Sequence, residues 1–238
     1  MKTALVTGGA KRVGAQIVKT LHRNGYDVII HYRNSEKAAH QLSKDLNNER
    51  HDSATTIRAD LNSTDDINKL KEKVTKLDLL VNNAAVFYPT PFDEADEKSW
   101  NDIVSTNLMS PFFLSQSLYK LLSKSNGCIV NIIDIHAERP LINHSIYNIS
   151  KSGLAMMTKT LAQDLSPNVR VCGVSPGSIL WPENYPKDNK YKEGVLDKIP
   201  LKRHGNVEDI ADTVVFLANS SYITGQIIFV DGGRSLCQ

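Results

Sequence analysis

Short apolar runs alternate with longer amphipathic segments along the whole chain. The apolar run at 3–7 leads into a glycine turn, and apolar residues then recur at helical spacing until Asn24-Gly25 ends the helix. Further strands are predicted at 28–30, 54–58, 77–81, 127–133, 169–174 and 227–230. Helices are predicted at about 35–48, from a cap at Ser63 or Thr64, at 98–124 with an interruption near Ser110-Pro111, at 145–165 and at 206–218.

Strands that alternate with helices, and that are apolar enough to be covered on both faces, are typical of a parallel doubly wound sheet. The 238 residues suit one core, and no repeat or linker divides them. The sequence therefore predicts an α/β protein of Rossmann type with a single domain at 1–238. The longest irregular stretch, around 177–205, carries Trp181 and Tyr185 and is interpreted as a lid over a substrate site.

Composition excludes several classes of function. A net charge of +2, from 28 basic and 26 acidic side chains, gives no field that favours nucleic acid or an anionic membrane. The N-terminus has neither a signal peptide nor a membrane span, and the three cysteines suggest no disulfide framework, so we expect a cytoplasmic protein. No metal is expected, because three histidines in the second half of the chain have neither ligand spacing nor a paired acid: His136, His144 and His204.

The first strand-to-helix turn is the expected contact for a dinucleotide pyrophosphate. Gly8 and Gly14 keep the outer glycine spacing of such turns, while Arg12 stands where many of them have another glycine. An ordinary tight turn is the alternative interpretation. The end of the second strand, 31–35, has no carboxylate before Glu36, which favours NADPH over NADH, and Arg33 is the predicted contact for the 2′-phosphate. Alternatively, Arg33 is a solvated loop residue.

The candidate catalytic residues are Asp134, Tyr147 and Lys151. Tyr147 and Lys151 are four residues apart, so on a helix they share a face, and an ammonium group there is expected to lower the pKa of the phenol. Such a phenol can donate a proton in a hydride-transfer reaction. The alternative is an amphipathic helix with a solvated lysine.

The chain resembles the short-chain dehydrogenase/reductase family from residue 2 to residue 233. The matching motifs are Thr7-Gly8 through Gly14, Asp60-Leu61, 82–85, Asn107, Tyr147 with Lys151, Pro176-Gly177, Thr224-Gly225 and 231–233. The resemblance implies that the first motif cradles pyrophosphate, Asp60-Leu61 contacts adenine and Asn107 holds a helix kink and a proton-relay water. The implied cofactor contacts are Gly8, Lys11, Arg12, Val13, Gly14, His31, Tyr32, Arg33, Asn34, Ser35, Asp60, Leu61, Asn83, Ala84, Ala85, Tyr147, Lys151, Pro176, Gly177 and Ser178.

Two departures from the usual family pattern resemble the pteridine reductases. Asp134 stands where the family usually has serine, and Arg12 where it has glycine. By this resemblance Phe87 stacks on a pterin ring, Arg12 reaches the ring's polar edge and Ser178 contacts both ligands. A serine hydroxyl can donate to a carbonyl oxygen, whereas a carboxylate suits the N–H groups of a pterin. The alternatives are that Asp134 orients a strand end and that Phe87 anchors a loop.

We therefore expect an NADPH-dependent pteridine reductase that uses a dihydropterin, a pterin or dihydrofolate. Hydride would move to a carbon of a C=N bond, and Tyr147, assisted by Asp134, would protonate the nitrogen; His31 and Ser35 are further candidates for the 2′-phosphate. The alternatives are a carbonyl reductase or alcohol dehydrogenase and a non-catalytic NADPH-binding protein. The resemblance also implies a homotetramer built through the Asn107 and Tyr147 helices and the C-terminal strand.

Overall fold

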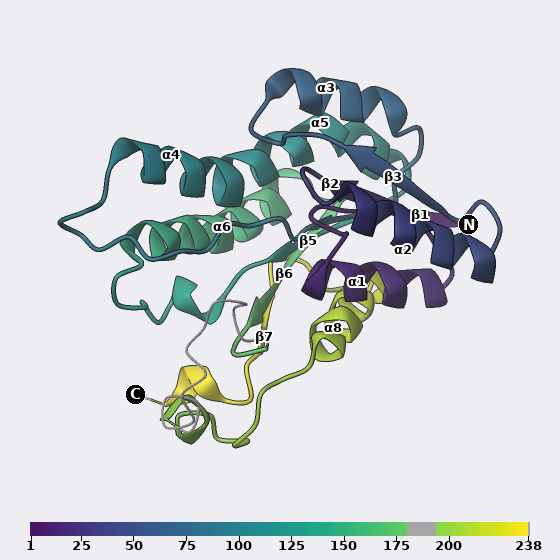
Figure 1. Cartoon of the computed structure of the whole chain (residues 1–238). Coiled ribbons are helices and arrows are strands. Elements are labelled where there is room, and N and C mark those ends of the chain that lie inside the picture. Colours follow the sequence, from purple (N-terminus) through teal and green to yellow (C-terminus); the bar gives the residue numbers. More distant parts are fainter. Residues whose placement is uncertain (180–193, 238) are drawn as a thin grey trace.

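A computed structural model describes residues 1–179 and 194–237, which form a parallel sheet with helices on both faces (Figure 1). The seven strands lie in the order β3-β2-β1-β4-β5-β6-β7, and every neighbouring pair is parallel. Their bounds are β1 Lys2–Val6, β2 Tyr26–Tyr32, β3 Ala54–Arg58, β4 Leu79–Asn82, β5 Cys128–Ile132, β6 Arg170–Pro176 and β7 Ile227–Val230. The predicted doubly wound α/β fold is confirmed.

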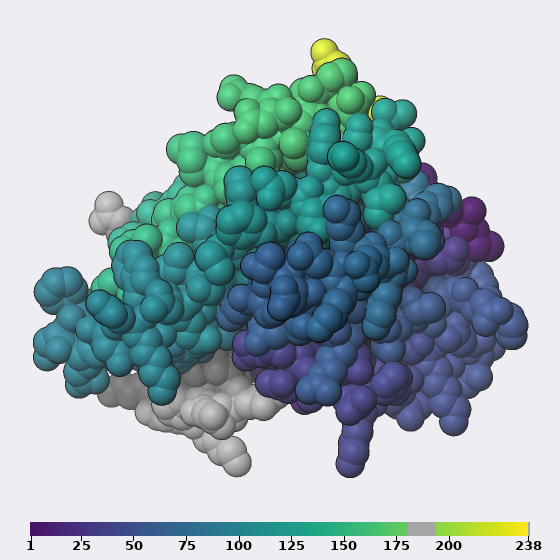
Figure 2. Space-filling model, turned by 90° about the horizontal axis from the view of Figure 1, so that it is seen from above, coloured from purple at the N-terminus to yellow at the C-terminus, as the bar shows by residue number. Residues whose placement is uncertain are grey.

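Helices fill the two outer layers because each turns an apolar stripe toward the sheet. One face carries α1 Arg12–Arg23, α2 Glu36–Glu49 and α8 Val207–Asn219. The other face carries α3 Thr64–Lys73, α5 Ser110–Lys124 and α6 Ser145–Asp164, with α4 Glu97–Val104 packed near α6. Figure 2 shows α3, α4 and α5 side by side across this second face.

The core has two apolar layers because successive strand residues point to opposite faces of the sheet. In β1, Val6 packs toward α1 and α8, whereas Leu5 packs toward α3 and α5. The central strands β4 and β5 are buried along their whole length. This explains why their sequences are continuous apolar runs rather than alternating ones.

Most predicted elements are confirmed, with local differences at their ends. The second strand begins at Tyr26 rather than Val28, and the fourth at Leu79 rather than Leu77. The cap of α3 is Ser63, whose hydroxyl accepts a hydrogen bond from the Asp66 N–H at 3.2 Å. These differences move no element to another layer.

The predicted helix at 98–124 is interrupted by a π-helical turn, Ser105–Met109, directly before α5. The carbonyl of Asn107 would accept from the N–H of residue 111 in an α-helix, but residue 111 is proline and has none. One extra residue is accommodated at this point, and the Ser110 N–H bonds back to the Ser105 carbonyl. The interruption therefore lies just before the proline that predicted it.

The predicted lid lies mainly at 180–193, outside the described residues. Its flanks approach each other, because the Gly205 N–H donates to the Ser178 carbonyl at 3.1 Å. Ile179, whose side chain lies against Gly205, is buried at this junction. Across 1–179 and 194–237, none of the helices has the length and apolar character needed to cross a membrane.

Candidate active site

The sheet reverses its winding direction between β1 and β4, where a ligand crevice is expected at the carboxyl ends of the strands. Thr7 and Asn83 join these two ends. The Thr7 hydroxyl accepts from the N–H groups of Asn83 and Ala84, at 2.9 and 3.0 Å, and the Asn83 amide donates to the Thr7 carbonyl at 2.8 Å. This network fixes the floor of the crevice.

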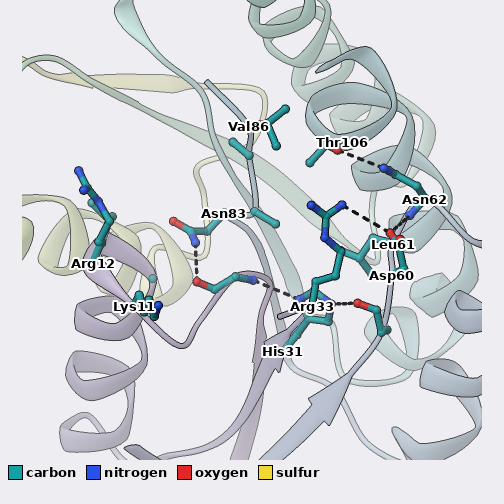
Figure 3. A pocket seen from close by; sticks show the side chains of 16 residues that line it. Lys11, Arg12, His31, Arg33, Asp60, Leu61, Asn62, Asn83, Val86 and Thr106 are labelled. Atoms are coloured by element: carbon teal, nitrogen blue, oxygen red, sulfur yellow. Dashed lines mark hydrogen bonds and ion pairs between the residues drawn. The ribbon is translucent and has the colours of Figure 1, made fainter. Parts of the chain in front are cut away.

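A pocket of about 380 Å³ opens above this floor (Figure 3). Its volume falls within the range of small-molecule sites. It is lined by Gly8, Lys11, Arg12, Val13, Gly14, His31, Arg33, Ala59, Asp60, Leu61, Asn62, Asn83, Ala84, Ala85, Val86 and Thr106. Most of the predicted cofactor contacts thus meet at one place, although they come from four separate segments of the chain.

The glycines of the first turn are required by close packing. A Cβ on Gly14 would lie 2.3 Å from the Gly8 carbonyl oxygen, and Gly8 itself has a φ of +61°. Larger residues would push the turn into the space above it. The turn therefore fits the close approach of a pyrophosphate.

The charge of the pocket also fits an anionic ligand. Its lining carries three cations, Lys11, Arg12 and Arg33, against one carboxylate, Asp60. Arg33 lies 3.9 Å from Asp60, and both side chains are nearly half exposed. The first turn of α1 has no acidic residue and no side-chain cap, so its N–H groups and positive dipole end face the pocket.

His31, a predicted contact for the 2′-phosphate, is bonded within the protein through both ring nitrogens. Its Nδ1 accepts from the Gly8 N–H at 3.1 Å, and its Nε2 donates to the Ala59 carbonyl at 3.1 Å. Burial lowers its pKa to about 4, so the ring is neutral. Because both nitrogens are occupied within the protein, His31 supports the glycine turn, and its contact with the 2′-phosphate stays a prediction.

Several predicted contacts lie outside this pocket. Tyr32 is buried in the core, with its ring edge toward His40. The stretch 34–35 leads into α2, and neither residue lines the pocket. Residues 176–178 lie at the end of β6 and just beyond it, where a Cβ on Gly177 would lie 2.6 Å from the Cβ of Asp231. Gly177 is therefore needed for packing, while contacts of 34–35 and 176–178 with a cofactor stay predictions.

Sequence reasoning missed four lining residues: Ala59, Asn62, Val86 and Thr106. Asn62 donates to the Thr106 hydroxyl at 3.2 Å, which connects the loop after β3 to the π-helical turn. Three of the four are next to predicted cofactor contacts, at Asp60, Leu61 and Ala85. Thr106 precedes Asn107 and could have been found from that neighbour alone.

Asp134, Tyr147 and Lys151 converge at the end of β5 and the first turns of α6. The Tyr147 hydroxyl donates to a carboxylate oxygen of Asp134 at 2.8 Å, and the other Asp134 oxygen accepts from the His136 N–H at 2.8 Å. Lys151 donates to the Ile132 carbonyl at 2.9 Å, with its Nζ 5.8 Å from the Tyr147 ring centre. The predicted grouping of these residues is thus present.

The electrostatics of this group differ from the prediction. Burial, with the charge and hydrogen bond of Asp134, raises the pKa of Tyr147 well above its usual value of 10. Burial also lowers the pKa of Lys151 to about 8, against the opposing effect of Asp134. The expected lowering of the Tyr147 pKa by Lys151 is therefore not seen, because the carboxylate is bonded to the phenol and the ammonium is not. Tyr147 is a neutral donor.

Asn107 joins the two parts of the site. Its side chain accepts from the Val86 N–H at 2.8 Å and donates to the Val86 carbonyl at 3.0 Å and to the Ser150 hydroxyl at 3.2 Å. Val86 lines the pocket and also packs in the small apolar cluster that contains Tyr147. Asn107 thereby links the pocket lining to α6, the helix that carries Tyr147. The proton-relay water at Asn107 stays a prediction.

Phe87 lies beside the proposed proton donor. Its ring centre is 4.8 Å from that of Tyr147 in an edge-to-face arrangement and 4.8 Å from that of His144 in a stacked one. Phe87 remains 44% exposed, which leaves apolar surface next to the tyrosine. No cluster of three or more metal-ligating side chains occurs within the described residues.

The parallel sheet, the glycine turn and the pocket above it are typical of dinucleotide-binding α/β proteins. A model of the family described as enoyl-(acyl carrier protein) reductase matches residues 8–235. The chain is 33% identical to pteridine reductase 1 of Leishmania tarentolae, with 98% of this chain and 96% of that protein covered. It is 33% identical to the 3-oxoacyl-(acyl-carrier-protein) reductase FabG of Staphylococcus epidermidis, with 98% of each covered, and 34% identical to that of Rickettsia bellii, with 98% and 96% covered.

The chain belongs to the short-chain dehydrogenase/reductase family. It is accordingly an oxidoreductase that uses a nicotinamide cofactor. The two kinds of relative match it about equally well, so the identity values do not choose between their substrates.

Proposed function

We propose that the protein is an NADPH-dependent pteridine reductase that acts on a dihydropterin, a pterin or dihydrofolate. The observation that carries the proposal is the 2.8 Å hydrogen bond from the Tyr147 hydroxyl to the Asp134 carboxylate. A carboxylate is the acceptor that ring N–H groups require, and it cannot donate to a ketone oxygen. The acid therefore suits a nitrogen heterocycle.

The pocket supports NADPH as the cofactor. The glycine turn and the N-terminus of α1 would hold the pyrophosphate, and Arg33 would pair with the 2′-phosphate. Arg33 is free to turn, because its ion pair with Asp60 is long and solvated. When bound, NADPH supplies the hydride that reduces the substrate carbon.

The side chains at the end of β5 and in the first turns of α6 would carry out the proton transfer. Tyr147 is protonated at neutral pH because its pKa is raised, so its proton is available when charge develops on a substrate nitrogen. A substrate nitrogen that replaces Asp134 as the acceptor would leave the carboxylate to bind a ring N–H. Lys151 would stabilise the tyrosinate once the proton has left, since its ammonium faces the same ring.

The site also has surfaces suited to a flat polar ring. Phe87 offers exposed aromatic surface within contact distance of Tyr147, which supports stacking of a bicyclic heterocycle. Arg12 lines the adjoining pocket in a left-handed conformation, with a φ of +53°. A guanidinium group there would bind the acceptor atoms at the edge of a pterin.

The second candidate is a reductase of ketones, and the relatives described as 3-oxoacyl-(acyl-carrier-protein) reductases support it. In that case the Tyr147 hydroxyl would donate to a carbonyl oxygen, and Asp134 would compete with the substrate for the same proton. This competition is the physical argument for placing the pterin first.

The test is NADPH oxidation by the purified protein with a dihydropterin, an oxidised pterin, dihydrofolate, a 3-oxoacyl thioester and a simple ketone. We expect turnover of at least one pterin or folate and little turnover of the ketones. Turnover of ketones alone would replace the proposal with the second candidate. NADPH binding without turnover of any substrate would support a non-catalytic role instead.

An Asp134→Ser variant sharpens the test. Because serine can donate to a carbonyl oxygen but accepts ring N–H groups less strongly, we expect pterin turnover to fall by about 100-fold relative to ketone turnover. The matched control is Asp45→Ser, which removes an exposed carboxylate on α2 that accepts a hydrogen bond from Gln41 at 2.7 Å. This control should leave the ratio of the two activities unchanged.

We also propose a homotetramer. The outer face of α5 and α6 carries an apolar groove beside exposed Met109, Phe112, Phe113 and Met156. Exposed apolar surface of this kind is typical of subunit contacts. Light scattering after size-exclusion chromatography measures the assembly, and a Phe113→Glu variant should shift it toward smaller species.

A further inference from the structure

The loop after β4 holds Phe87 between two anchored neighbours. The backbone of Val86 is bound on both its N–H and its carbonyl by Asn107, and the Tyr88 hydroxyl donates to Asp102 at 3.0 Å. These contacts attach the loop to the π-helical turn and to α4. The main chain of Phe87 is therefore fixed, while its ring is not held by either neighbour.

The same loop is joined to the segment that precedes α6. The Thr90 N–H donates to the Asn143 carbonyl at 2.6 Å, and Thr90 forms an isolated parallel bridge with His144. His144 is itself fixed, because its Nδ1 donates to the Ile142 carbonyl at 2.8 Å. The bridge thus brings a restrained imidazole next to the Phe87 loop.

The ring of His144 lies parallel to that of Phe87, with centres 4.8 Å apart and planes inclined by 15°. Tyr147, three residues further along, meets Phe87 edge to face at 78°. Phe87 is therefore held by the donor on one side and by the imidazole on another, and 44% of its surface stays exposed. His144 thus fixes the orientation of the Phe87 ring. A substrate ring that stacks on the exposed surface of Phe87 would be oriented by it in turn.

We infer that His144 is a positioning residue for the substrate: it stacks on Phe87 and holds the ring ready for a flat bicyclic heterocycle. This inference rests on the proposed pteridine reductase function. Without the imidazole, Phe87 must lose side-chain freedom each time a substrate binds, and binding weakens. A small ketone that does not stack on Phe87 would be unaffected.

The experiment measures binding as well as turnover. Oxidised pterin is titrated by calorimetry into protein saturated with NADP⁺, a state that holds no hydride and cannot react. For His144→Ala we expect the Kd of the pterin to rise about threefold to tenfold, which corresponds to the ordering of one side chain. The KM of the substrate should rise by a similar factor, while kcat changes by less than about twofold.

Two further variants separate positioning from a general effect on folding. His144→Phe keeps a flat ring on Phe87 and should restore most of the pterin affinity. His136→Ala is the matched control, since His136 makes the same kind of Nδ1 hydrogen bond to a loop carbonyl, that of Arg139, at 2.7 Å, but stacks on no ring among the residues that the structure describes. It should bind pterin as the wild type does.

Each remaining outcome has a defined meaning. If wild-type protein reduces pterins and His144→Ala binds them with unchanged Kd, the inference is wrong and the proposed function stands. Tighter binding by His144→Ala would also overturn it, because the imidazole would then occupy the substrate's place. If wild-type protein neither binds nor reduces any pterin, the proposed function itself fails.

Discussion

Opposite ends of the sheet each hold a group of three polar residues that resembles catalytic machinery. At the carboxyl end are Asp134, Tyr147 and Lys151. Near the amino end, His22 Nε2 lies 2.7 Å from the Ser53 hydroxyl, and His22 Nδ1 lies 3.7 Å from a Glu49 oxygen. By residue types alone, the second group has the composition of a hydrolase triad.

The difference between the two groups is where their hydrogen bonds end. Ser53 is 2% exposed and donates its proton to the Arg50 carbonyl, so its oxygen has no access to a substrate. The Tyr147 hydroxyl bonds to a carboxylate that is only partly buried and lies next to exposed aromatic surface. A substrate can replace that acceptor. The amino-end group therefore stabilises the fold, and the carboxyl-end group can do chemistry.

The strongest test of this contrast removes the hydroxyl of Tyr147. Tyr147→Phe should lower kcat by about 10²- to 10⁴-fold, because the proton donor is lost, while NADPH affinity and melting temperature change little. Steady-state kinetics and thermal denaturation measure the two effects. The control is Tyr26→Phe, which alters a buried tyrosine at the amino end of the sheet. This variant should have the kcat of the wild type. If Tyr147→Phe has the kcat of the wild type, Tyr147 is not the proton donor.

The buried imidazole under the glycine turn should make stability depend on pH. The folded-state pKa of His31 is lowered to about 4, so its contribution is complete above 6.5 and is lost as the pH falls from 6.5 toward 4. The loss amounts to roughly 3 kcal/mol. Urea unfolding of wild type and His31→Gln across this range measures it, and the variant's profile should be flatter. The fully exposed His51 supplies the control, as His51→Gln should keep the wild-type slope.

Cofactor choice should depend on one cation at the pocket mouth. Arg33→Ala is expected to raise the Kd of NADPH by about 10- to 100-fold and to leave NADH almost unaffected, because a charged hydrogen bond to the 2′-phosphate is lost. Calorimetric titration with both dinucleotides checks this. Arg58→Ala, at the exposed end of β3 and outside the pocket, is the matched control. Equal losses for both cofactors would argue against a 2′-phosphate contact.

The smallest effect is expected at the amino end of the sheet. Ser53→Ala leaves the His22 N–H and the Arg50 carbonyl without their partner, which should cost about 1–2 kcal/mol of unfolding free energy. Denaturant titration measures the cost. Turnover at saturating substrate should match the wild type. A large loss of activity in a stable Ser53→Ala protein would mean that the two ends are not independent.

Local patterns determined the fold because periodicity and breakers act over short distances. The π-helical turn illustrates this, since Pro111 marks the interruption within a few residues. The tyrosine and lysine of α6 were likewise readable, because a helical offset fixes a shared face. The glycine turn could be predicted for the same reason, since Gly14 permits an approach that any Cβ would block.

Contacts between distant segments could not be predicted in this way. The spacing of Tyr147 and Lys151 suggested a lowered phenol pKa, but the backbone directs the lysine to the Ile132 carbonyl and the phenol to Asp134. His31 follows an apolar strand like a ligand contact, yet its neighbours occupy both nitrogens. Each outcome depends on burial and on partners more than ten residues away.

The sequence by itself determined the alternation of strands and helices, the place of the glycine turn and the residue types available for chemistry. Only the tertiary structure decided which of those side chains meet, which are neutral and which stay accessible. The reason is physical: hydrophobic period and backbone stereochemistry are local, whereas desolvation and hydrogen-bond partnership depend on every segment that packs against a group. The stack of His144 on Phe87 joins residues more than fifty positions apart in the chain, so only the tertiary structure could reveal it.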